Sequence, residues 1–392
     1  MARIEVEDRF LIYREPDEDP RGHLCEPRMT RARDGRIFLS FRTGTLRYSP
    51  DGSPRLLTSA DGGRSWTDLG RVLDGALPGQ PGWDYRALAL TELPDGGLLG
   101  VSVGLDRVSH GKEPWLVYNP DPAFYQGMIP IRNWVSRSAD GGRTWAAPWP
   151  MEGLTVPNSS AQVLVTLPSG LVVCPLETFK DFAEPGPWRY RVDMIRTRDA
   201  GRSWGETAPA HMSDAEGDPR NLMCWDPRLS LLPDGRLVQC YYAFPNGTGG
   251  EDPIHIGWST DEGRTWSVPR SIGVRGQAMF PIPLPGGGIV GFFQRRHEPQ
   301  GVVAVYSPDG GETWPAAADP ALETVVYAHE RPSGRGFGEG ADAAQYMNDM
   351  IHFTFGHPTG VPIGPDRALA VWYAGDETRT EIWGAYLRVV QD

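Results

Sequence analysis

The sequence predicts an all-β fold, a six-bladed β-propeller whose blades are four-stranded antiparallel sheets. Three observations predict it. An octapeptide occurs five times, a turn followed by a strand-like run occurs six times out of phase with it, and no long stretch shows helical periodicity. Two or three separate sandwiches would not explain a shared turn at a fixed place in each unit. A repeated blade around an axis does explain it.

The octapeptide has the pattern Ser/Thr-x-Asp-x-Gly-x-Ser/Thr-Trp, and its copies begin at Ser59, Ser138, Thr197, Ser259 and Ser307. Their mean spacing of about 62 residues divides the 392-residue chain into six units. The aspartate can accept hydrogen bonds from the backbone of its own turn, the glycine allows a positive φ, and the tryptophan packs under the turn. We therefore assign these residues to turn architecture and not to catalysis.

The second pattern is a tight turn, usually Pro-Asp-Gly or a variant, followed by a β-rich run. Asp-Gly and Gly-Gly between apolar runs supply the positive φ angles of hairpins. Each repeat therefore holds two hairpins, or about four strands. The six runs are residues 36–41, 97–103, 171–176, 236–242, 288–293 and 367–373.

The two ends of the chain both have strand patterns. The sixth unit lacks the octapeptide and ends in the strand-like residues 381–389, and residues 4–13 form another strand-like run before the first unit. We expect residues 1–392 to form a single domain in which the N-terminal strand completes the last blade.

Composition limits the possible partners. The net charge of −12 argues against binding to nucleic acid or to an anionic membrane surface. No run approaches 18 apolar residues, so no membrane span is expected. No apolar signal region is visible, which favours the cytoplasm, or a secreted or periplasmic location if the sequence is a mature form. The four cysteines stand alone, so we expect no disulfide framework, no metal site and no cofactor.

The octapeptide is the motif called the Asp box, and five Asp boxes on six predicted blades resemble the sialidase (neuraminidase) superfamily over essentially the whole chain. The motif is specific for the fold and not for the activity, because such propellers include other glycosidases, sugar lyases and non-catalytic proteins. The resemblance implies a site where the innermost strands begin. There, three arginines bind the substrate carboxylate, a tyrosine assisted by a carboxylate is the nucleophile, and an aspartate is the acid/base.

Four residues match positions of that family. Arg28 lies where the first arginine is expected, before the blade-one turn, and Arg296 follows the fifth β-rich run. Tyr346 matches the tyrosine that begins the inner strand of the last blade. Asp51 is the carboxylate between Arg42 and the first Asp box, so it is the candidate general acid. The alternative for Asp51 is a structural aspartate of a turn.

Blade four departs from the family pattern. The family has a glutamate before this inner strand and an arginine after it. Here Asp226 stands in place of the glutamate, and the run 236–242 is followed by Ala243 and Phe244 with no arginine.

Instead, the chain repeats its own pattern of an acidic residue, any residue and an arginine. Residues i and i+2 of a strand share a face, so each acid and its arginine are expected to project together into the funnel. The alternative is that each pair is a structural salt bridge between neighbouring blades. The three copies are Glu26-Pro27-Arg28, Asp84-Tyr85-Arg86 and Asp226-Pro227-Arg228.

The leading hypothesis is a sialidase-like exo-glycosidase that hydrolyses a terminal acidic sugar, sialic acid or a related keto-acid sugar. Tyr346 is the expected nucleophile, with Asp226 or Asp84 as its partner and Asp51 as acid/base. One alternative is a uronate-sugar lyase, in which a tyrosine or one of His23 and His352 removes a proton, or another glycosidase. A further alternative is a non-catalytic glycan-binding propeller. The expected substrate-binding residues are Arg28, Arg86, Arg228, Arg296 and Glu26.

Overall fold

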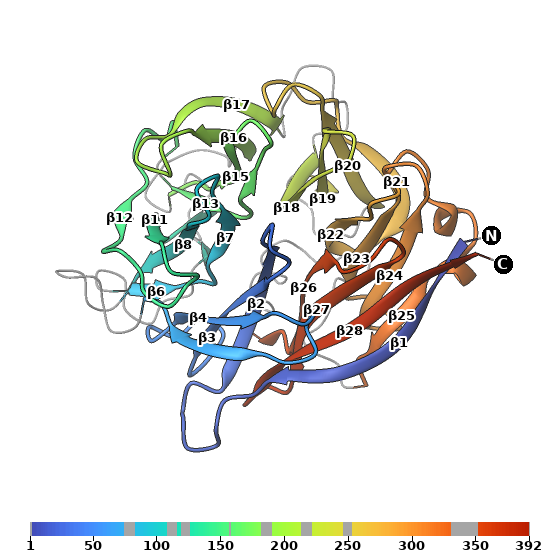
Figure 1. Cartoon of the computed structure of the whole chain (residues 1–392), viewed down its shortest axis with the longest axis horizontal. Helices are drawn as coiled ribbons and strands as arrows, with labels where there is room; N and C mark the ends of the chain where they lie inside the picture. Colours follow the sequence, from blue (N-terminus) through green and yellow to red (C-terminus); the bar gives the residue numbers. More distant parts are fainter. Residues whose placement is uncertain are drawn as a thin grey trace. The chain divides into compact units, whose positions relative to one another are not determined.

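The computed structural model confirms the predicted fold class. The sheets are six blades of antiparallel strands, four strands deep, as in a β-propeller (Figure 1). Two single-turn 3-10 helices, Pro315–Ala317 and Pro320–Leu322, are the helical elements with assigned bounds in the part of the chain that the structure describes. No helix there is long and apolar enough to cross a membrane. The structure describes residues 2–73, 83–107, 116–118, 126–156, 158–181, 190–212, 222–245, 253–330 and 352–391.

The chain divides into two compact units. The N-terminal unit contains residues 16–24 and 28–216, and the C-terminal unit contains residues 1–15, 25–27 and 217–392. The single-domain organisation of the whole chain stays a prediction.

Blades one to three lie in the N-terminal unit, apart from residues 25–27 of the first strand. Blade one consists of β2 (His23–Arg31), β3 (Ile37–Gly44), β4 (Ser53–Ser59) and β5 (Thr67–Arg71). In blades two and three the inner edge is divided into two short strands. Blade two consists of β6 (Trp83–Tyr85), β7 (Ala89–Glu92), β8 (Leu98–Asp106), β11 (Ile131–Ser138) and β12 (Trp149–Pro150). Blade three consists of β13 (Ser159–Ala161), β14 (Val165–Thr166), β15 (Val172–Thr178), β16 (Arg191–Thr197) and β17 (Gly205–Met212). The strands β9 (Leu116–Tyr118) and β10 (Gln126–Met128) form a separate hairpin.

Blades four to six belong to the C-terminal unit. Blade four consists of β18 (Leu222–Leu231), β19 (Leu237–Pro245), β20 (Pro253–Ser259) and β21 (Arg270–Arg275). Blade five consists of β22 (Gln277–Pro283), β23 (Ile289–Arg295), β24 (Gly301–Ser307) and β25 (Thr324–Ala328). Blade six consists of β26 (Phe355–Pro362), β27 (Arg367–Gly375), β28 (Thr380–Gln391) and β1 (Ala2–Tyr13). The six β-rich runs of the sequence are thus the second strands of the six blades.

The two ends of the chain lie in the same sheet. β1 pairs antiparallel with β28 over a register that runs from Ala2 opposite Gln391 to Tyr13 opposite Ile382, and Figure 1 shows the two strands side by side. The last blade is therefore made of the first strand and the last three strands of the chain.

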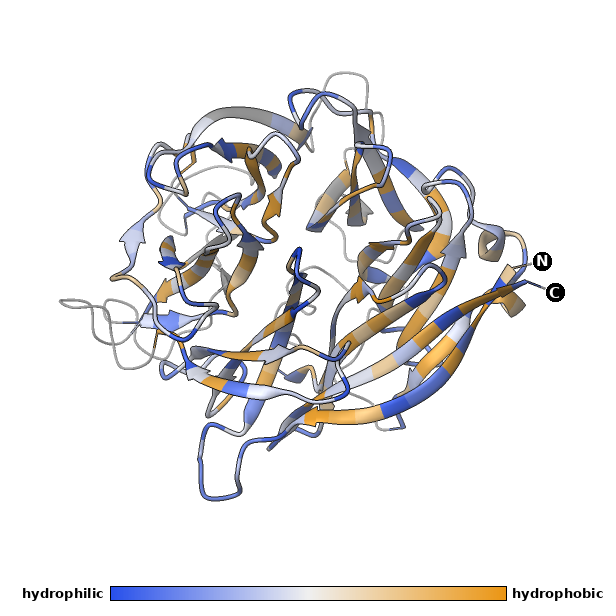
Figure 2. Ribbon diagram, viewed as in Figure 1, coloured by the Kyte–Doolittle hydropathy of each residue, from blue (hydrophilic) through white to orange (hydrophobic). Residues whose placement is uncertain are grey.

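The hydrophobic core lies between neighbouring sheets within each unit. In the C-terminal unit one cluster joins Val238 and Ile256 of blade four to Phe293 and Trp314 of blade five. In the N-terminal unit a matching cluster joins blades two and three. Burying each such large apolar side chain contributes about 1.5–3 kcal/mol. Figure 2 shows these hydrophobic residues concentrated in the strands and the hydrophilic residues in the connecting turns.

Each Asp box forms a turn after the third strand of its blade. In the first box, Asp61 Oδ1 accepts hydrogen bonds from the backbone N–H groups of Arg64 and Ser65, both at 3.0 Å. Gly63 has a φ of 89°, and Trp66 Nε1 donates to its carbonyl oxygen at 3.0 Å. These bonds stay within the turn, which fits the architectural role assigned from the sequence.

The Asp boxes should make the fold sensitive to acid. Hydrogen bonds from Ser65, Thr144 and Ser203 lower the pKa values of Asp61, Asp140 and Asp199 from 3.8 to about 2. A carboxyl whose pKa is lower in the folded state stabilises the fold above the unfolded pKa. That stabilisation is lost as the pH falls from about 4 to about 2.

Urea unfolding between pH 5 and pH 2 measures this loss. We expect the urea midpoint to fall over that interval. A variant with Asn at the three Asp-box positions should lose stability at pH 5 and show a flatter dependence on pH. An equally steep dependence in that variant would assign the acid sensitivity to other carboxyls.

Candidate functional site

The inner strands of blades four and six each contain a bulge, and each bulge includes a polar residue with a positive φ. The register of β18 against β19 shifts between Trp225 and Arg228, and that of β26 against β27 shifts between Gly356 and Thr359. Within these bulges Asp226 has a φ of 52° and His357 a φ of 46°. Positive φ is unfavourable for residues other than glycine and is concentrated at functional sites, and bulges redirect side chains. The two bulges therefore mark a candidate site in the C-terminal unit.

Arg228 joins the two bulges. Its Nη2 donates to Asp226 Oδ1 at 3.2 Å and lies 3.3 Å from His357 Nδ1. Arg228 is 3% exposed, whereas Asp226 and His357 are partly exposed. Its Nε has no hydrogen-bond partner within the described ranges. The structure thus brings together the predicted pair Asp226 and Arg228 and adds His357, a residue that the sequence interpretation did not include.

A chain of buried amides holds the His357 bulge in place. The backbone N–H of His357 donates to Gln294 Oε1 at 2.7 Å, and Gln294 Nε2 donates to Gln277 Oε1 at 3.3 Å. Gln277 Nε2 in turn donates to the hydroxyl oxygen of Tyr242 at 3.0 Å. A Cβ atom at Gly356 would lie 2.2 Å from Gln294 Oε1, so this position requires glycine. The strained backbone of His357 is therefore fixed by side chains from blades four and five.

Arg296 packs in the interior of the same unit. Its guanidinium carbon lies 3.9 Å from the ring centroid of Phe353 and 4.2 Å from that of Phe355. Its Nη2 donates to the carbonyl oxygen of Phe355 at 2.6 Å, and the residue is 1% exposed. This environment shields the guanidinium from solvent, and Arg296 packs against the two phenylalanine rings. Tyr346, the predicted nucleophile, lies outside the described residues.

Arg28, in the N-terminal unit, is held by a chain of polar residues of blade three. Its Nη1 donates to the carbonyl oxygen of Ala161 at 3.4 Å and its Nη2 to Gln162 Oε1 at 3.3 Å. Gln162 Nε2 donates to Glu177 Oε2 at 2.8 Å, and the Tyr190 hydroxyl donates to Glu177 Oε1 at 2.8 Å. Arg28 is partly exposed, whereas Gln162, Glu177 and Tyr190 are buried. Arg28 therefore has a fixed orientation and an accessible part, as a ligand-binding arginine requires.

Asp84 is enclosed by arginines from two blades. Its Oδ1 accepts from Arg42 Nε at 2.9 Å, and its Oδ2 lies 3.8 Å from Arg86 Nη1 and from Arg107 Nη2. Asp84 is fully buried. Burial raises the pKa of Asp84, and the charges of Arg42 and Arg107 oppose that rise. The ion pair between neighbouring blades is the one that Asp84 makes with Arg42 of blade one, because Arg86 belongs to blade two, as Asp84 does. The guanidinium of Arg86 also stacks on the Tyr48 ring at 4.6 Å.

Asp51 holds the loop between β3 and β4. Its carboxylate accepts from the backbone N–H of Thr45 at 3.1 Å and from Thr45 Oγ1 at 2.5 Å. Burial raises the pKa of Asp51, but hydrogen bonds from Ser49 and Thr45 outweigh it, so the pKa lies below its ordinary value. A general acid at neutral pH needs a raised pKa. These contacts fit the turn alternative for Asp51.

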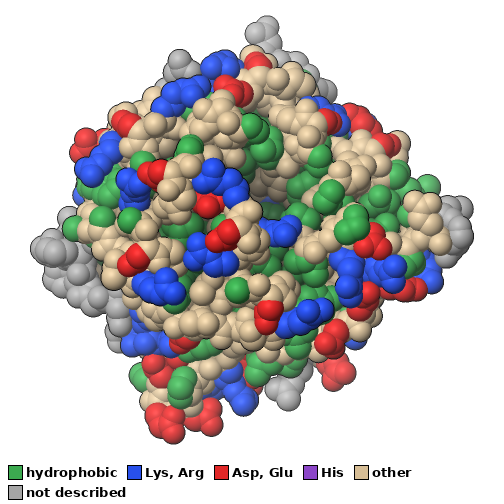
Figure 3. Space-filling view, viewed as in Figure 1, with side chains coloured by type: hydrophobic (Ala, Val, Ile, Leu, Met, Phe, Trp, Pro, Cys, Tyr) green, Lys and Arg blue, Asp and Glu red, His purple; other side chains and the backbone are tan. Residues whose placement is uncertain are grey.

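The other predicted residues, Glu26, His23 and His352, differ in burial. Glu26 is buried and has a φ of 56°, so it repeats in β2 the backbone geometry of Asp226. His23 is buried, and His352 is exposed. No group of three or more metal-ligating side chains is found among the residues described. On the face shown in Figure 3, basic and acidic side chains are interspersed and do not form a single basic area.

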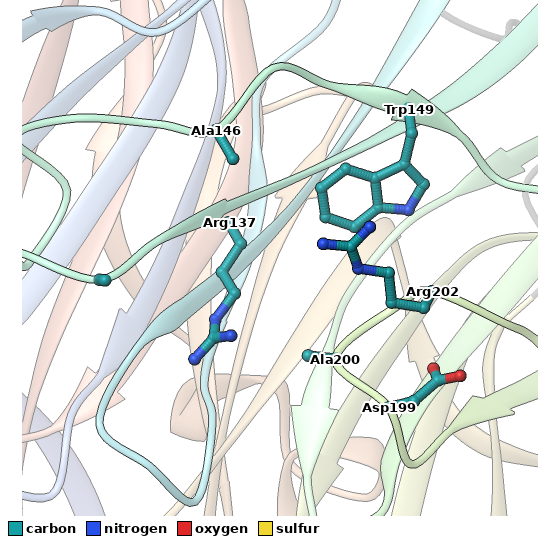
Figure 4. A pocket seen from close by; sticks show the side chains of 7 residues that line it. Arg137, Ala146, Trp149, Asp199, Ala200 and Arg202 are labelled. Atoms are coloured by element: carbon teal, nitrogen blue, oxygen red, sulfur yellow. The ribbon is translucent and has the colours of Figure 1, made fainter.

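A pocket of about 300 Å³ lies apart from these residues, beside the Asp box of blade three. Figure 4 shows Arg202 extended beneath the ring of Trp149, with the guanidinium carbon 5.0 Å from the ring centroid. Asp199, on the same turn as Arg202, uses its carboxylate to hold that turn. None of the predicted site residues lines this pocket.

Comparisons with known proteins support the fold. No family model matches the chain, and no curated protein matches it. Among solved structures, a protein of unknown function from Dyadobacter fermentans has a TM-score of 0.68 and 19% identity, over 99% of each chain. The NanB sialidase from Streptococcus pneumoniae has a TM-score of 0.61 and 10% identity, over 97% of this chain and 70% of that one. The α-L-arabinanase of Penicillium chrysogenum, complexed with arabinobiose, has a TM-score of 0.60 and 15% identity, over 97% of this chain and 98% of that one.

At these identities the likeness is one of fold. The chain shares the β-propeller architecture of glycoside hydrolases that include a sialidase and an arabinanase. The predicted resemblance to sialidase-like propellers is confirmed at that level.

Proposed function

We propose that the protein is a glycoside hydrolase that removes a terminal acidic sugar, with sialic acid or a related keto-acid sugar as substrate. The observation that carries the proposal is the buried guanidinium of Arg228, held by Asp226 and His357 at two strained backbone positions. A guanidinium binds a carboxylate through paired charge-assisted hydrogen bonds, and its orientation decides how well it does so. Arg28, in the N-terminal unit, is also held in one orientation and is partly exposed, and its role in binding an anion stays a prediction.

The chemistry of an acidic sugar explains the proposed nucleophile. A substrate carboxylate at the anomeric carbon repels a carboxylate nucleophile, whereas a tyrosine hydroxyl is neutral until it reacts. A phenol has an ordinary pKa near 10, so it needs a carboxylate to receive its proton at neutral pH. We assign the nucleophile to Tyr346 and the proton acceptor to Asp226, and we propose Arg296 as a supporting residue of the same unit.

The test is hydrolysis of 4-methylumbelliferyl sialoside. We expect the full-length protein to release 4-methylumbelliferone and Tyr346→Phe to lower kcat by about 100-fold or more, because phenylalanine has no hydroxyl to act as the nucleophile. Tyr306→Phe is the control, since Tyr306 directly precedes the Asp-box residue Ser307 and should leave kcat within about twofold. Absence of release by the unaltered protein, or full activity of Tyr346→Phe, would overturn the proposal.

A second candidate is a hydrolase of neutral arabinose oligosaccharides. The observation that favours it is that the fold of this chain is as similar to the arabinanase, with a TM-score of 0.60, as to the sialidase, with a TM-score of 0.61. Incubation with arabinobiose separates the two candidates, because release of arabinose without hydrolysis of the sialoside would identify the neutral sugar as the substrate.

A further inference from the structure

The contact between Arg228 and His357 restricts the protonation of the histidine. Arg228 Nη2 lies 3.3 Å from His357 Nδ1. A guanidinium has only hydrogen-bond donors, so Nδ1 must be the acceptor in this contact. A neutral imidazole that accepts at Nδ1 carries its proton on Nε2. Protonation of both ring nitrogens would place an N–H group and a positive charge against the guanidinium.

Arg228 Nη2 can satisfy both of its neighbours. It carries two hydrogens, which suffice for one bond to Asp226 Oδ1 at 3.2 Å and one to His357 Nδ1. Asp226 therefore balances the charge of Arg228 without displacing the histidine from it. Arg228 can therefore donate to His357 Nδ1 and remain paired with Asp226 at the same time.

The histidine is also held in position from its own backbone. Its φ of 46° and the 2.7 Å bond from its N–H to Gln294 Oε1 fix the start of the side chain. The ring lies 6.1 Å from the Tyr373 ring at an angle of 35°, and the residue is partly exposed. The result is an imidazole with one ring nitrogen turned to Arg228 and part of its surface accessible.

We propose that His357 is a sugar-binding residue whose Nε2–H, selected by Arg228, donates a hydrogen bond to a hydroxyl oxygen of the bound sugar. The proposal rests on the proposed glycan-binding function but not on the sugar being acidic. The role of Arg228 here is to set the donor of its neighbour, and it is separate from the anion binding proposed above.

Two substitutions of His357 distinguish the role of Nδ1 from the role of Nε2. In His357→Asn the amide oxygen can accept from Arg228, but no donor remains at the position of Nε2. In His357→Gln the longer side chain places an amide donor near the position of Nε2. Loss of one hydrogen bond to the sugar corresponds to about a tenfold loss of affinity. We expect that loss in His357→Asn and a change within about threefold in His357→Gln, with Arg270→Ala as the exposed control.

Affinities for N-acetylneuraminic acid and for arabinobiose are measured by calorimetry on the full chain. The imidazole is followed by two-dimensional 1H–15N NMR, with the His357 signals assigned by their loss in His357→Asn. We expect the Nε2–H tautomer at neutral pH and a shift of the Nε2 resonance when a sugar binds.

The outcomes distinguish this proposal from the proposed function. A His357 shift and an Asn-specific loss with arabinobiose but not with N-acetylneuraminic acid would support the role of His357 and overturn the acidic substrate. A Nδ1–H or doubly protonated ring at neutral pH would overturn the tautomer argument whatever binds. An unchanged Nε2 resonance with both sugars, or equal affinities of His357→Asn and the unaltered protein, would overturn the role of His357.

Discussion

Replacing Asp84 with alanine is expected to lower the free energy of unfolding by about 3–5 kcal/mol. Asp84 is fully buried, and Arg42, Arg86 and Arg107 all direct guanidinium groups toward its carboxylate. Removing the carboxylate leaves three positive charges close together in a site with little access to water. Such uncompensated buried charge is among the most destabilising results of a single substitution. Urea unfolding at pH 7 measures the loss.

A matched exposed pair provides the control for Asp84. Asp95 is paired with Arg137, and the two side chains are 57% and 38% exposed. Exposed ion pairs contribute about 0–1 kcal/mol, so Asp95→Ala should have a small effect. Equal effects of Asp84→Ala and Asp95→Ala would show that the buried cluster does not hold blades one and two together.

The sequence was sufficient to predict the fold because its signals are local. The turn of an Asp box uses residues within eight positions, such as Asp61 and Trp66, and a hairpin needs only its Asp-Gly and the adjoining strand. The Asp84 cluster was only half predictable. Arg86 is two residues from Asp84, whereas Arg42 comes from another blade, and no local pattern indicates that a residue 42 positions away will approach the carboxylate.

The candidate site shows a similar division. The acid–x–arginine pattern identified Asp226 and Arg228, although they meet across a bulge and not on the common face of a regular strand. His357 was missed because it has no arginine two residues later. A signal did exist: His357 precedes a proline, as Glu26 and Asp226 do, and all three have positive φ. Gln162 and Glu177, which orient Arg28, carry no comparable pattern, because their roles depend on contacts between strands.

Replacing Arg228 with alanine is expected to lower kcat/KM for the sialoside by about 100-fold or more. Removing one member of a buried charged contact costs about 2–5 kcal/mol of binding, and 2.7 kcal/mol is about 100-fold. Arg228→Lys should recover only part of the activity, since an ammonium group cannot make the paired contacts of a guanidinium. The fold should survive, because Asp226 is one-quarter exposed and can be solvated when its partner is removed.

Two comparisons test the role of Arg228 further: binding of an acidic against a neutral sugar, and the effect of Arg228→Ala combined with His357→Asn. Arg270→Ala is the control, since Arg270 is about half exposed and pairs with Glu312 on the surface. If Arg228 binds the substrate carboxylate, its loss should weaken binding of N-acetylneuraminic acid far more than binding of arabinobiose. If it also sets the tautomer of His357, the effects of Arg228→Ala and His357→Asn should be smaller together than their sum. Equal losses for both sugars would assign Arg228 to positioning alone, and strictly additive effects would separate the arginine from the histidine.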